Sequence, residues 1–371
     1  MRTPAPAHPS RPDLRARCRP RHFLRWSAVL LVAGLPRSTP AIAQSASTIA
    51  GISCDAGSRC RTHLTVPALG ADTAVLLPVT VLRGTRPGPT LAITAGVHGG
   101  EYVPILAAQR VATTVDPLQL TGTIVIVHVT NPVSFFGRGV YYTPADGRNL
   151  NRMFPGRADG SLSERTAHVV FTEVIRRADA YLDLHCGDAN EALRPYVATR
   201  VSGDSAYDAR VRALAIATGL ELLLETPVPT PVPTPPGTTT MTAAVNRIPG
   251  FTIEWGMLGR TDDASVNGQL QAVLGVARGM GMLRGRPGHD GRLRMTGSRT
   301  ATAPVSGLVR VDVALDQAVR EGERIAVIHD LFGVQLAEVK APVSGRVIAF
   351  TATPPVRSGE PVVAIGIPAP R

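Results

Sequence analysis

A histidine and a glutamate three residues apart are the first candidates for chemistry. His98 and Glu101 lie in the glycine-rich turn 96–101, which follows the apolar run 91–95. The run predicts a buried parallel strand, and residues 102–111 predict a helix. Catalytic groups of open α/β sheets lie in the turns that connect the carboxyl end of a strand to the next helix. The pair therefore supplies two ligands of a zinc site, although a surface histidine beside a helix-initiating glutamate would look the same.

Two further groups end predicted strands and decide between these interpretations. His185 closes the run 180–185, and Glu254 lies near the end of the run 251–256. Because the carboxyl ends of parallel strands share one edge of a sheet, all four side chains are expected to meet there. Asp183 shares a strand face with His185, so it either supports a ligand or has a structural role. The sequence predicts a metal site at this edge.

The elements that must position these residues alternate along the chain. Strands are predicted at 75–81, 123–127 and 221–224, and helices at 162–178, 206–218 and 266–283. Strands alternating with helices over about 70–285 predict an α/β domain with a largely parallel sheet. The long irregular segment 133–160 is expected to be functional. The proline-rich segment 226–236 is either a stiff excursion near the site or a ligand for a partner domain.

The last seventy or so residues contain an internal repeat. The sequence at 303–307 recurs at 341–345, and that at 319–323 recurs in similar form at 356–360. Two β-rich halves with matching turns predict a small sandwich built by duplication. Its layout resembles biotinyl and lipoyl carrier domains, but the hairpin 329–333 between the halves has no lysine, and Lys340 lies beyond it. A structural cap or an oligomer contact is therefore expected.

The amino-terminal segment has the layout of a secretory signal peptide. Seven arginines and one aspartate precede the apolar run 26–35, and Ala41 to Ala43 offer a small-x-small cleavage site. We expect residues 1–43 to be removed on export to the periplasm or the outside. The run is too short for a stable membrane anchor. Pro20 occupies the first position of a twin-arginine pair, so the export route stays open.

Charge and cysteine usage agree with export. The formal charge is +11, but residues 1–43 hold eight arginines and one aspartate, a net +7, which leaves +4 for the rest. With no clustered basic stripe, a nucleic-acid partner is not expected. In an oxidising compartment Cys54 and Cys60 are expected to pair, the alternative being two free thiols in the segment 44–69. Cys186 is left over.

Four motifs together resemble the succinylglutamate desuccinylase/aspartoacylase family, which belongs to the zinc carboxypeptidase clan. They lie at 96–101, 149–156, 183–185 and 253–256, and the resemblance covers about residues 75–285. It implies a zinc-carboxypeptidase-like hydrolase domain at 70–288. The tail, 289–371, resembles the small all-β, barrel-sandwich-like domain that such proteins often carry.

The resemblance also implies residue roles. His98, Glu101 and His185 would bind one zinc per chain. Glu254 would be the general base that takes a proton from the zinc-bound water. Asn151 and Arg152 would hold a substrate carboxylate.

Two features of the long loop qualify these roles. Apolar neighbours of Arg152 predict a desolvated guanidinium, paired with the substrate anion or with Asp146. Relatives usually carry an arginine where this chain has Tyr141. Arg148 or Arg138 would then polarise the carbonyl, or Tyr141 would donate a hydrogen bond instead.

These observations favour an exported zinc deacylase. Its substrate would be a small carboxylate-bearing molecule such as an N-acyl amino acid, cleaved at an amide or ester bond. A metallocarboxypeptidase acting on peptides or cell-wall fragments is the alternative within the same chemistry. A non-catalytic zinc-binding module is a third, but a site without turnover has no need of Glu254. A homo-oligomer stays open.

Overall fold

The computed structural model describes residues 51–290 and 293–370. The expected signal peptide, residues 1–43, lies outside the described residues. Among the described residues, no helix is both long enough and apolar enough to cross a membrane.

Four neighbouring parallel strands form the centre of the sheet: β4 (Thr121–Val127), β3 (Arg86–Ala95), β5 (Ala180–His185) and β9 (Gly250–Glu254). Every residue of β5 is buried. Strands covered on both faces read as near-continuous apolar runs, which is why the sequence predicts them well. The predicted α/β domain with a largely parallel core is confirmed.

Antiparallel strands extend this core on both sides. β2 (Val75–Arg83) pairs with β4, and β1 (Ser58–Val66) pairs with β2 along its whole length. The sheet thus begins before residue 70, inside the segment expected to precede the domain. On the other side, β7 (Tyr196–Val201) is antiparallel to β9 and parallel to β8 (Leu222–Pro227). Neither β1 nor β7 was predicted, because polar residues interrupt both runs.

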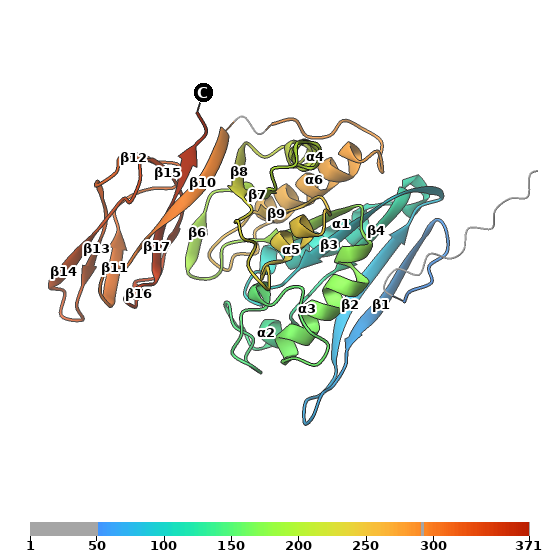
Figure 1. Ribbon diagram of the computed structural model, residues 1–371, viewed down its shortest axis with the longest axis horizontal. Coiled ribbons are helices and arrows are strands. Elements are labelled where there is room, and N and C mark those ends of the chain that lie inside the picture. Colours follow the sequence, from blue (N-terminus) through green and yellow to red (C-terminus); the bar gives the residue numbers. More distant parts are fainter. Residues whose placement is uncertain (1–50, 291–292, 371) are drawn as a thin grey trace, which may run out of the picture. The chain divides into compact units, whose positions relative to one another are not determined.

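Helices cover both faces of the sheet (Figure 1). One face packs against α1 (Tyr102–Thr114), α4 (Ser205–Ala217) and α6 (Asp263–Gly279). The other packs against α3 (Leu162–Glu173) and α5 (Thr239–Val245). Ser161 caps α3 in a capping box with Glu164. The regular helix ends before the predicted residue 178, and a 3-10 turn, η3 (Ile175–Arg177), follows it.

The long loop after β4 is ordered by its apolar residues. It contains α2 (Pro132–Phe136) and the 3-10 turn η2 (Leu150–Arg152), while the 3-10 turn η1 (Pro117–Gln119) lies before β4. Leu150 and Phe154 are buried. Phe154 also exchanges backbone hydrogen bonds of 2.9 Å with Gly237 at the end of the proline-rich segment. This contact ties the two loops together beside the predicted site.

The carboxyl-terminal β domain continues the same sheet. β10 (Leu293–Thr302) is parallel to β8 and antiparallel to β17 (Pro361–Pro368). β15 (Gly345–Thr351) follows on β17 and also pairs with β6 (Glu191–Leu193) of the catalytic domain. Two regions that are separate in the sequence are therefore joined by backbone pairing.

Within the β domain, strands of the first half pair with strands of the second half. β11 (Gly307–Val311), after the first repeat, pairs with β16 (Pro355–Val356) of the second half. β15, after the second repeat, pairs with β12 (Ala318–Val319) of the first half. β11 and β16 belong to a second sheet, whose other strands are β13 (Arg324–His329) and β14 (Gln335–Lys340). The duplicated pattern therefore forms an antiparallel β domain with its own apolar core.

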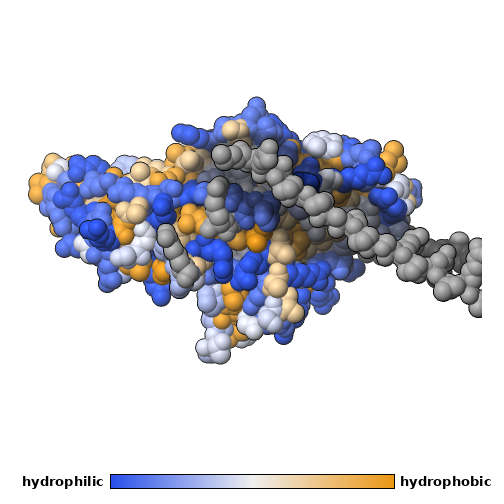
Figure 2. All heavy atoms as spheres, turned by 90° about the horizontal axis from the view of Figure 1, so that it is seen from above, coloured by the Kyte–Doolittle hydropathy of each residue, from blue (hydrophilic) through white to orange (hydrophobic). Residues whose placement is uncertain are grey.

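The hairpin between β13 and β14 ends in exposed apolar residues. Leu331 is 83% exposed and Phe332 is 94% exposed. Figure 2 shows hydrophobic spheres at the end of the molecule where Figure 1 places β13 and β14. Lys340 lies at the end of β14, not at the hairpin tip.

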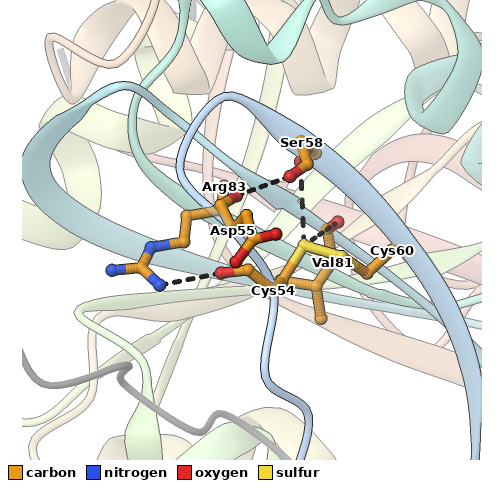
Figure 3. The surroundings of a disulfide bond; sticks show 6 residues. All are labelled: Cys54, Asp55, Ser58, Cys60, Val81 and Arg83. Atoms are coloured by element: carbon orange, nitrogen blue, oxygen red, sulfur yellow. Dashed lines mark hydrogen bonds between the residues drawn. A yellow bond between two sulfur atoms is a disulfide. The ribbon is translucent and has the colours of Figure 1, made fainter.

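A disulfide fixes the start of β1 (Figure 3). Cys54 and Cys60 are bonded, as expected, whereas Cys186 is free and buried. An Nη atom of Arg83 donates a hydrogen bond of 2.7 Å to the carbonyl oxygen of Cys54. The Ser58 hydroxyl donates one of 2.7 Å to the carbonyl oxygen of Asp55. These contacts hold residues 54–60 against the first hairpin of the sheet.

Candidate metal centre

The turn after β3 is shaped by its glycines. Gly96 has φ +64°, a conformation that residues with a side chain rarely adopt. A Cβ atom on Gly99 would lie 2.2 Å from the backbone carbon of Ser134. Only glycine therefore lets the loop after β4 approach this turn. Glu101 is the N-cap residue of α1, which fixes it next to His98.

The structure brings His98, Glu101 and His185 together. One ligand-type atom from each lies within 4.8 Å of the other two, and all three residues are buried. Nδ1 of His98 lies 2.6 Å from Oε1 of Glu101, and Nδ1 of His185 lies 2.8 Å from Oε2. The three predicted metal ligands thus converge on one point.

The outward-facing nitrogen of each imidazole has a partner of its own. Nε2 of His185 lies 2.9 Å from Oδ2 of Asp183, and Nε2 of His98 lies 3.2 Å from Oδ1 of Asn149. The Thr239 hydroxyl donates a hydrogen bond to Asp183 in turn. Such partners orient imidazole ligands in metal sites. Of the two roles open for Asp183, the geometry therefore favours support of His185.

This donor set fits a zinc ion. Two imidazole nitrogens and one carboxylate form a ligand set of catalytic zinc sites. Burial raises the pKa of Glu101, but the charges of His185 and His98 outweigh it and lower that pKa to about 2. Glu101 is therefore an ionised carboxylate, the form that binds a cation. His98, Glu101 and His185 would hold the metal.

Glu254 lies beside the three ligands. β5 and β9 pair in parallel register with His185 opposite Glu254, so the two side chains leave the same face of the sheet. Burial raises the pKa of Glu254 to about 8, with the charge of His185 opposing and those of Glu101 and Glu191 adding to the rise. A carboxylate with so raised a pKa is suited to take up a proton near neutral pH.

Two acidic residues near the site were not anticipated. Asp188 is fully buried, and neither of its carboxylate oxygens has a hydrogen-bond partner among the described residues. Burial and the charge of Glu101 raise the pKa of Asp188 to about 9 and that of Glu191 to about 7. Both residues follow His185 in the segment after the end of β5. The strand-end rule that indicated His185 could therefore have indicated them.

Tyr141 reaches the site from the long loop. Its ring meets the His98 ring edge-on, with the ring centres 5.6 Å apart. Burial and the charges of Glu191 and Asp188 raise the pKa of Tyr141. The phenol therefore stays protonated and is a hydrogen-bond donor.

The two arginines considered as alternatives to Tyr141 are exposed. Nη1 of Arg148 lies 4.0 Å from the Met153 sulfur, and Arg138 has a positive φ of 51° in an exposed turn. Among the described residues, neither contacts the three ligands. Tyr141 is therefore the predicted carbonyl-polarising candidate that the structure places at the centre.

Asn151 and Arg152 differ in their setting. The Asn151 amide lies 3.5 Å from Nε2 of His185, and its oxygen accepts a 3.1 Å hydrogen bond from the Thr239 backbone. Arg152 is exposed, and one Nη atom donates to the Asn151 carbonyl at 2.8 Å. The expectation of a desolvated Arg152 is wrong, because its apolar neighbours Leu150 and Phe154 turn inward, away from it. Asp146 instead accepts hydrogen bonds from Ser163.

Comparison with known proteins places this site in a family. The sequence model of the succinylglutamate desuccinylase/aspartoacylase catalytic domain matches residues 87–280, more than half of the chain. A curated relative, the N-alpha-acetyl-L-2,4-diaminobutyric acid deacetylase of Halomonas elongata, is 37% identical over 147 residues. That match spans 39% of this chain and only 42% of the relative.

Solved structures extend the likeness over most of the chain. A succinylglutamate desuccinylase/aspartoacylase from Rhodobacter sphaeroides is 25% identical with a TM-score of 0.76, covering 86% of this chain and 99% of its own. The product-bound ectoine utilization protein of Ruegeria pomeroyi is 26% identical with a TM-score of 0.77, covering 85% and 98%. These structures cover 86% and 85% of this chain, whereas the match to the catalytic-domain model ends at residue 280. The structural likeness therefore includes the carboxyl-terminal β domain.

Proposed function

Because this chain belongs to the succinylglutamate desuccinylase/aspartoacylase family, we propose that it is a zinc-dependent hydrolase that removes the acyl group from an N-acyl amino acid. The observation that carries the proposal is the convergence of His98, Glu101 and His185 with Glu254 beside them. A cation site next to an uncoordinated carboxylate of raised pKa is the arrangement needed for metal-assisted hydrolysis of an amide.

Each residue has a separate task in this mechanism. A zinc ion held by His98, Glu101 and His185 would supply a water acidic enough to react near neutral pH and would polarise the amide carbonyl. Glu254 accepts the proton of the attacking water and then delivers it to the leaving amine. The Tyr141 hydroxyl donates a hydrogen bond to the carbonyl oxygen as negative charge develops there. Asn151 and Arg152 bind the carboxylate of the amino acid and fix its orientation.

The acidic residues favour a substrate that also carries a positive charge. Burial and the charge of Glu101 raise the pKa values of Asp188, Glu191 and Glu254, and the charge of Glu191 adds to the rise at Asp188 and Glu254. An ammonium group on the substrate would relieve that repulsion. The Halomonas elongata relative is named for a diaminobutyric acid derivative, whose side chain bears an amine. We therefore place N-acyl derivatives of basic amino acids first among the substrates.

Export is part of the proposal. The predicted signal peptide supports it, and so does the Cys54–Cys60 disulfide, since such bonds persist in oxidising compartments. Fractionation of cells expressing the full chain with a carboxyl-terminal tag would test it. Recovery of the uncleaved protein in the cytoplasm would refute this part alone.

Zinc content and turnover test the central claim together. We expect about one zinc per chain in the purified protein and little in His98→Ala or His185→Ala. Glu254→Gln should keep the metal and lose turnover by at least about a thousandfold, since its carboxylate acts on the water and is not a ligand. The substrates are N-acetyl-diaminobutyrate, N-acetylaspartate, N-succinylglutamate and a set of dipeptides. Full metal occupancy in both histidine variants, or hydrolysis of the dipeptides alone, would overturn the proposal.

A further inference from the structure

A cavity of about 580 Å³ lies at the edge of the sheet, between α1 and the strands β1, β2 and β4. The three proposed metal ligands do not line it. Its apolar wall comes from Pro78, Ala112 and Val129, and its polar wall includes Arg61 and His128. None of the described residues that line it is acidic. The cavity therefore combines an apolar surface with donor and cationic groups.

Arg61 is the feature that indicates a ligand. Arg59, two residues earlier and on the same face of β1, donates hydrogen bonds of 3.3 Å and 3.0 Å to the carbonyl oxygens of Thr113 and Val115. Arg61 is exposed on β1 at the cavity, and no carboxylate pairs with it within the part of the chain that the structure describes. Two arginines of one strand thus differ: one anchors the end of α1, and the other lines a cavity without a counter-ion.

His128 points to the same kind of ligand. Its Nε2 lies 2.7 Å from the Thr80 hydroxyl, whereas its Nδ1 is buried without a hydrogen-bond partner among the described residues. Burial and the charge of Arg61 lower the pKa of His128 to about 4. His63, on the same face of β1, completes the polar rim.

We propose that this cavity is a second ligand site and that it binds a small organic anion, a carboxylate on a short hydrocarbon body. Arg61 would pair with the carboxylate, and Pro78, Ala112 and Val129 would cover the hydrocarbon. The volume is large enough to admit a molecule of this size. The site is separate from the hydrolytic centre, so it does not depend on the proposed function.

Calorimetric titration of the zinc-loaded protein with acetate, butanoate and hexanoate tests the assignment. Affinity should rise by up to about fourfold for each methylene that becomes buried. Arg61→Gln should weaken hexanoate binding about threefold to fivefold, because an exposed charge-assisted contact is lost. Arg61→Lys should retain most of it. Arg152→Ala removes the proposed carboxylate contact of the active site and so distinguishes the two sites, because hexanoate held in the cavity should still bind to this variant.

A cavity-filling variant protects the test against a folding defect. Gln109 is exposed on α1 and lines the cavity, so Gln109→Trp should block hexanoate without removing a charge or a core contact. Unchanged binding in Arg61→Gln or in Gln109→Trp would overturn the proposal. So would a loss of binding in Arg152→Ala, which would place the ligand in the active site. Inorganic phosphate bound as tightly as hexanoate would refute the apolar part of the ligand.

Discussion

The raised pKa of Glu254 results from its neighbours as much as from its burial. Carboxylates of Glu101, Glu191 and Asp183 act on it from the turn before α1, from β6 and from β5, while His185 opposes them. A general base must be ionised to accept a proton, so kcat/KM should rise with pH as Glu254 loses its proton. This dependence can be adjusted at a residue that does not take part in the chemistry.

Glu191→Gln should move the rising limb of the pH profile to lower pH. Removing a negative neighbour makes ionisation of Glu254 easier and lowers its pKa, and we expect the half-maximal pH to fall by about 0.5 to 1. The measurement is kcat/KM between pH 5 and pH 10. Glu321→Gln, a remote exposed change, should leave the limb in place. An upward shift in Glu191→Gln would show that Glu254 does not carry this limb.

Arg152 provides a second test at the level of single residues. Because it is exposed and held only through the Asn151 carbonyl, Arg152→Ala should cost no stability. It should lower kcat/KM about 10- to 100-fold for substrates with a free carboxylate. Amidated analogues should be poor substrates of the native protein and unaffected by the change. Equal losses for both kinds of substrate would remove Arg152 from carboxylate recognition.

At the level of elements, β1 depends on the disulfide before it. β1 is an edge strand with few apolar residues, and only Leu64 and Val66 in it are fully buried. The bond between Cys54 and Cys60, with the Arg83 contact to the Cys54 carbonyl, holds its first residues against β2. Arg61 of the proposed anion site follows directly, so the disulfide also positions that wall.

Replacing both cysteines of the disulfide by serine should destabilise the protein by about 2 kcal/mol. The closed loop is short, so the loop-closure entropy removed from the unfolded chain is modest. Urea unfolding of the native and double-serine proteins, each with and without dithiothreitol, measures the effect. The reductant should weaken the native protein and leave the variant unchanged. Equal stability of the oxidised native protein and the variant would show that the bond does not hold β1.

At the level of the whole molecule, the β domain supports the catalytic one. Leu222 and Leu224 of β8 pack with Met295 and Ile348 of the β domain in one apolar cluster. The Arg194 guanidinium binds both Glu221 and Asp316 across the same junction. β15 also pairs with β6, the strand that carries Glu191. The β domain therefore helps to place a residue that acts on Glu254.

Ile348→Asp should destabilise the protein by about 3 kcal/mol or more, because it buries an unpaired charge between the domains. It should also perturb the pH profile through Glu191. Leu336→Asp, at a 49% exposed position on β14, is the matched control and should change stability by less than about 0.5 kcal/mol. The comparison uses urea unfolding of both variants. Equal stability of the two would mean that the junction contributes little to folding.

The ligand types and the strand-turn-helix units that present them follow from the sequence alone. His98, Glu101, His185 and Glu254 each lie at a strand end, and buried parallel strands are local apolar runs that can be identified without knowing their partners. The order of those strands could not be identified in the same way, because pairing joins residues far apart. β1 and β7 went unpredicted for this reason: their partners, and not their own composition, make them strands.

Which other side chains reach the centre depends on contacts between distant segments of the chain. Glu191 is placed by pairing with Thr351, 160 residues along the chain, and Arg152 is exposed because Leu150 and Phe154 turn inward beneath it. Burial and long-range charge also set the pKa values of Glu254 and Asp188. Local sequence specifies which groups are available for catalysis, while contacts between distant segments specify their distances, their exposure and their protonation.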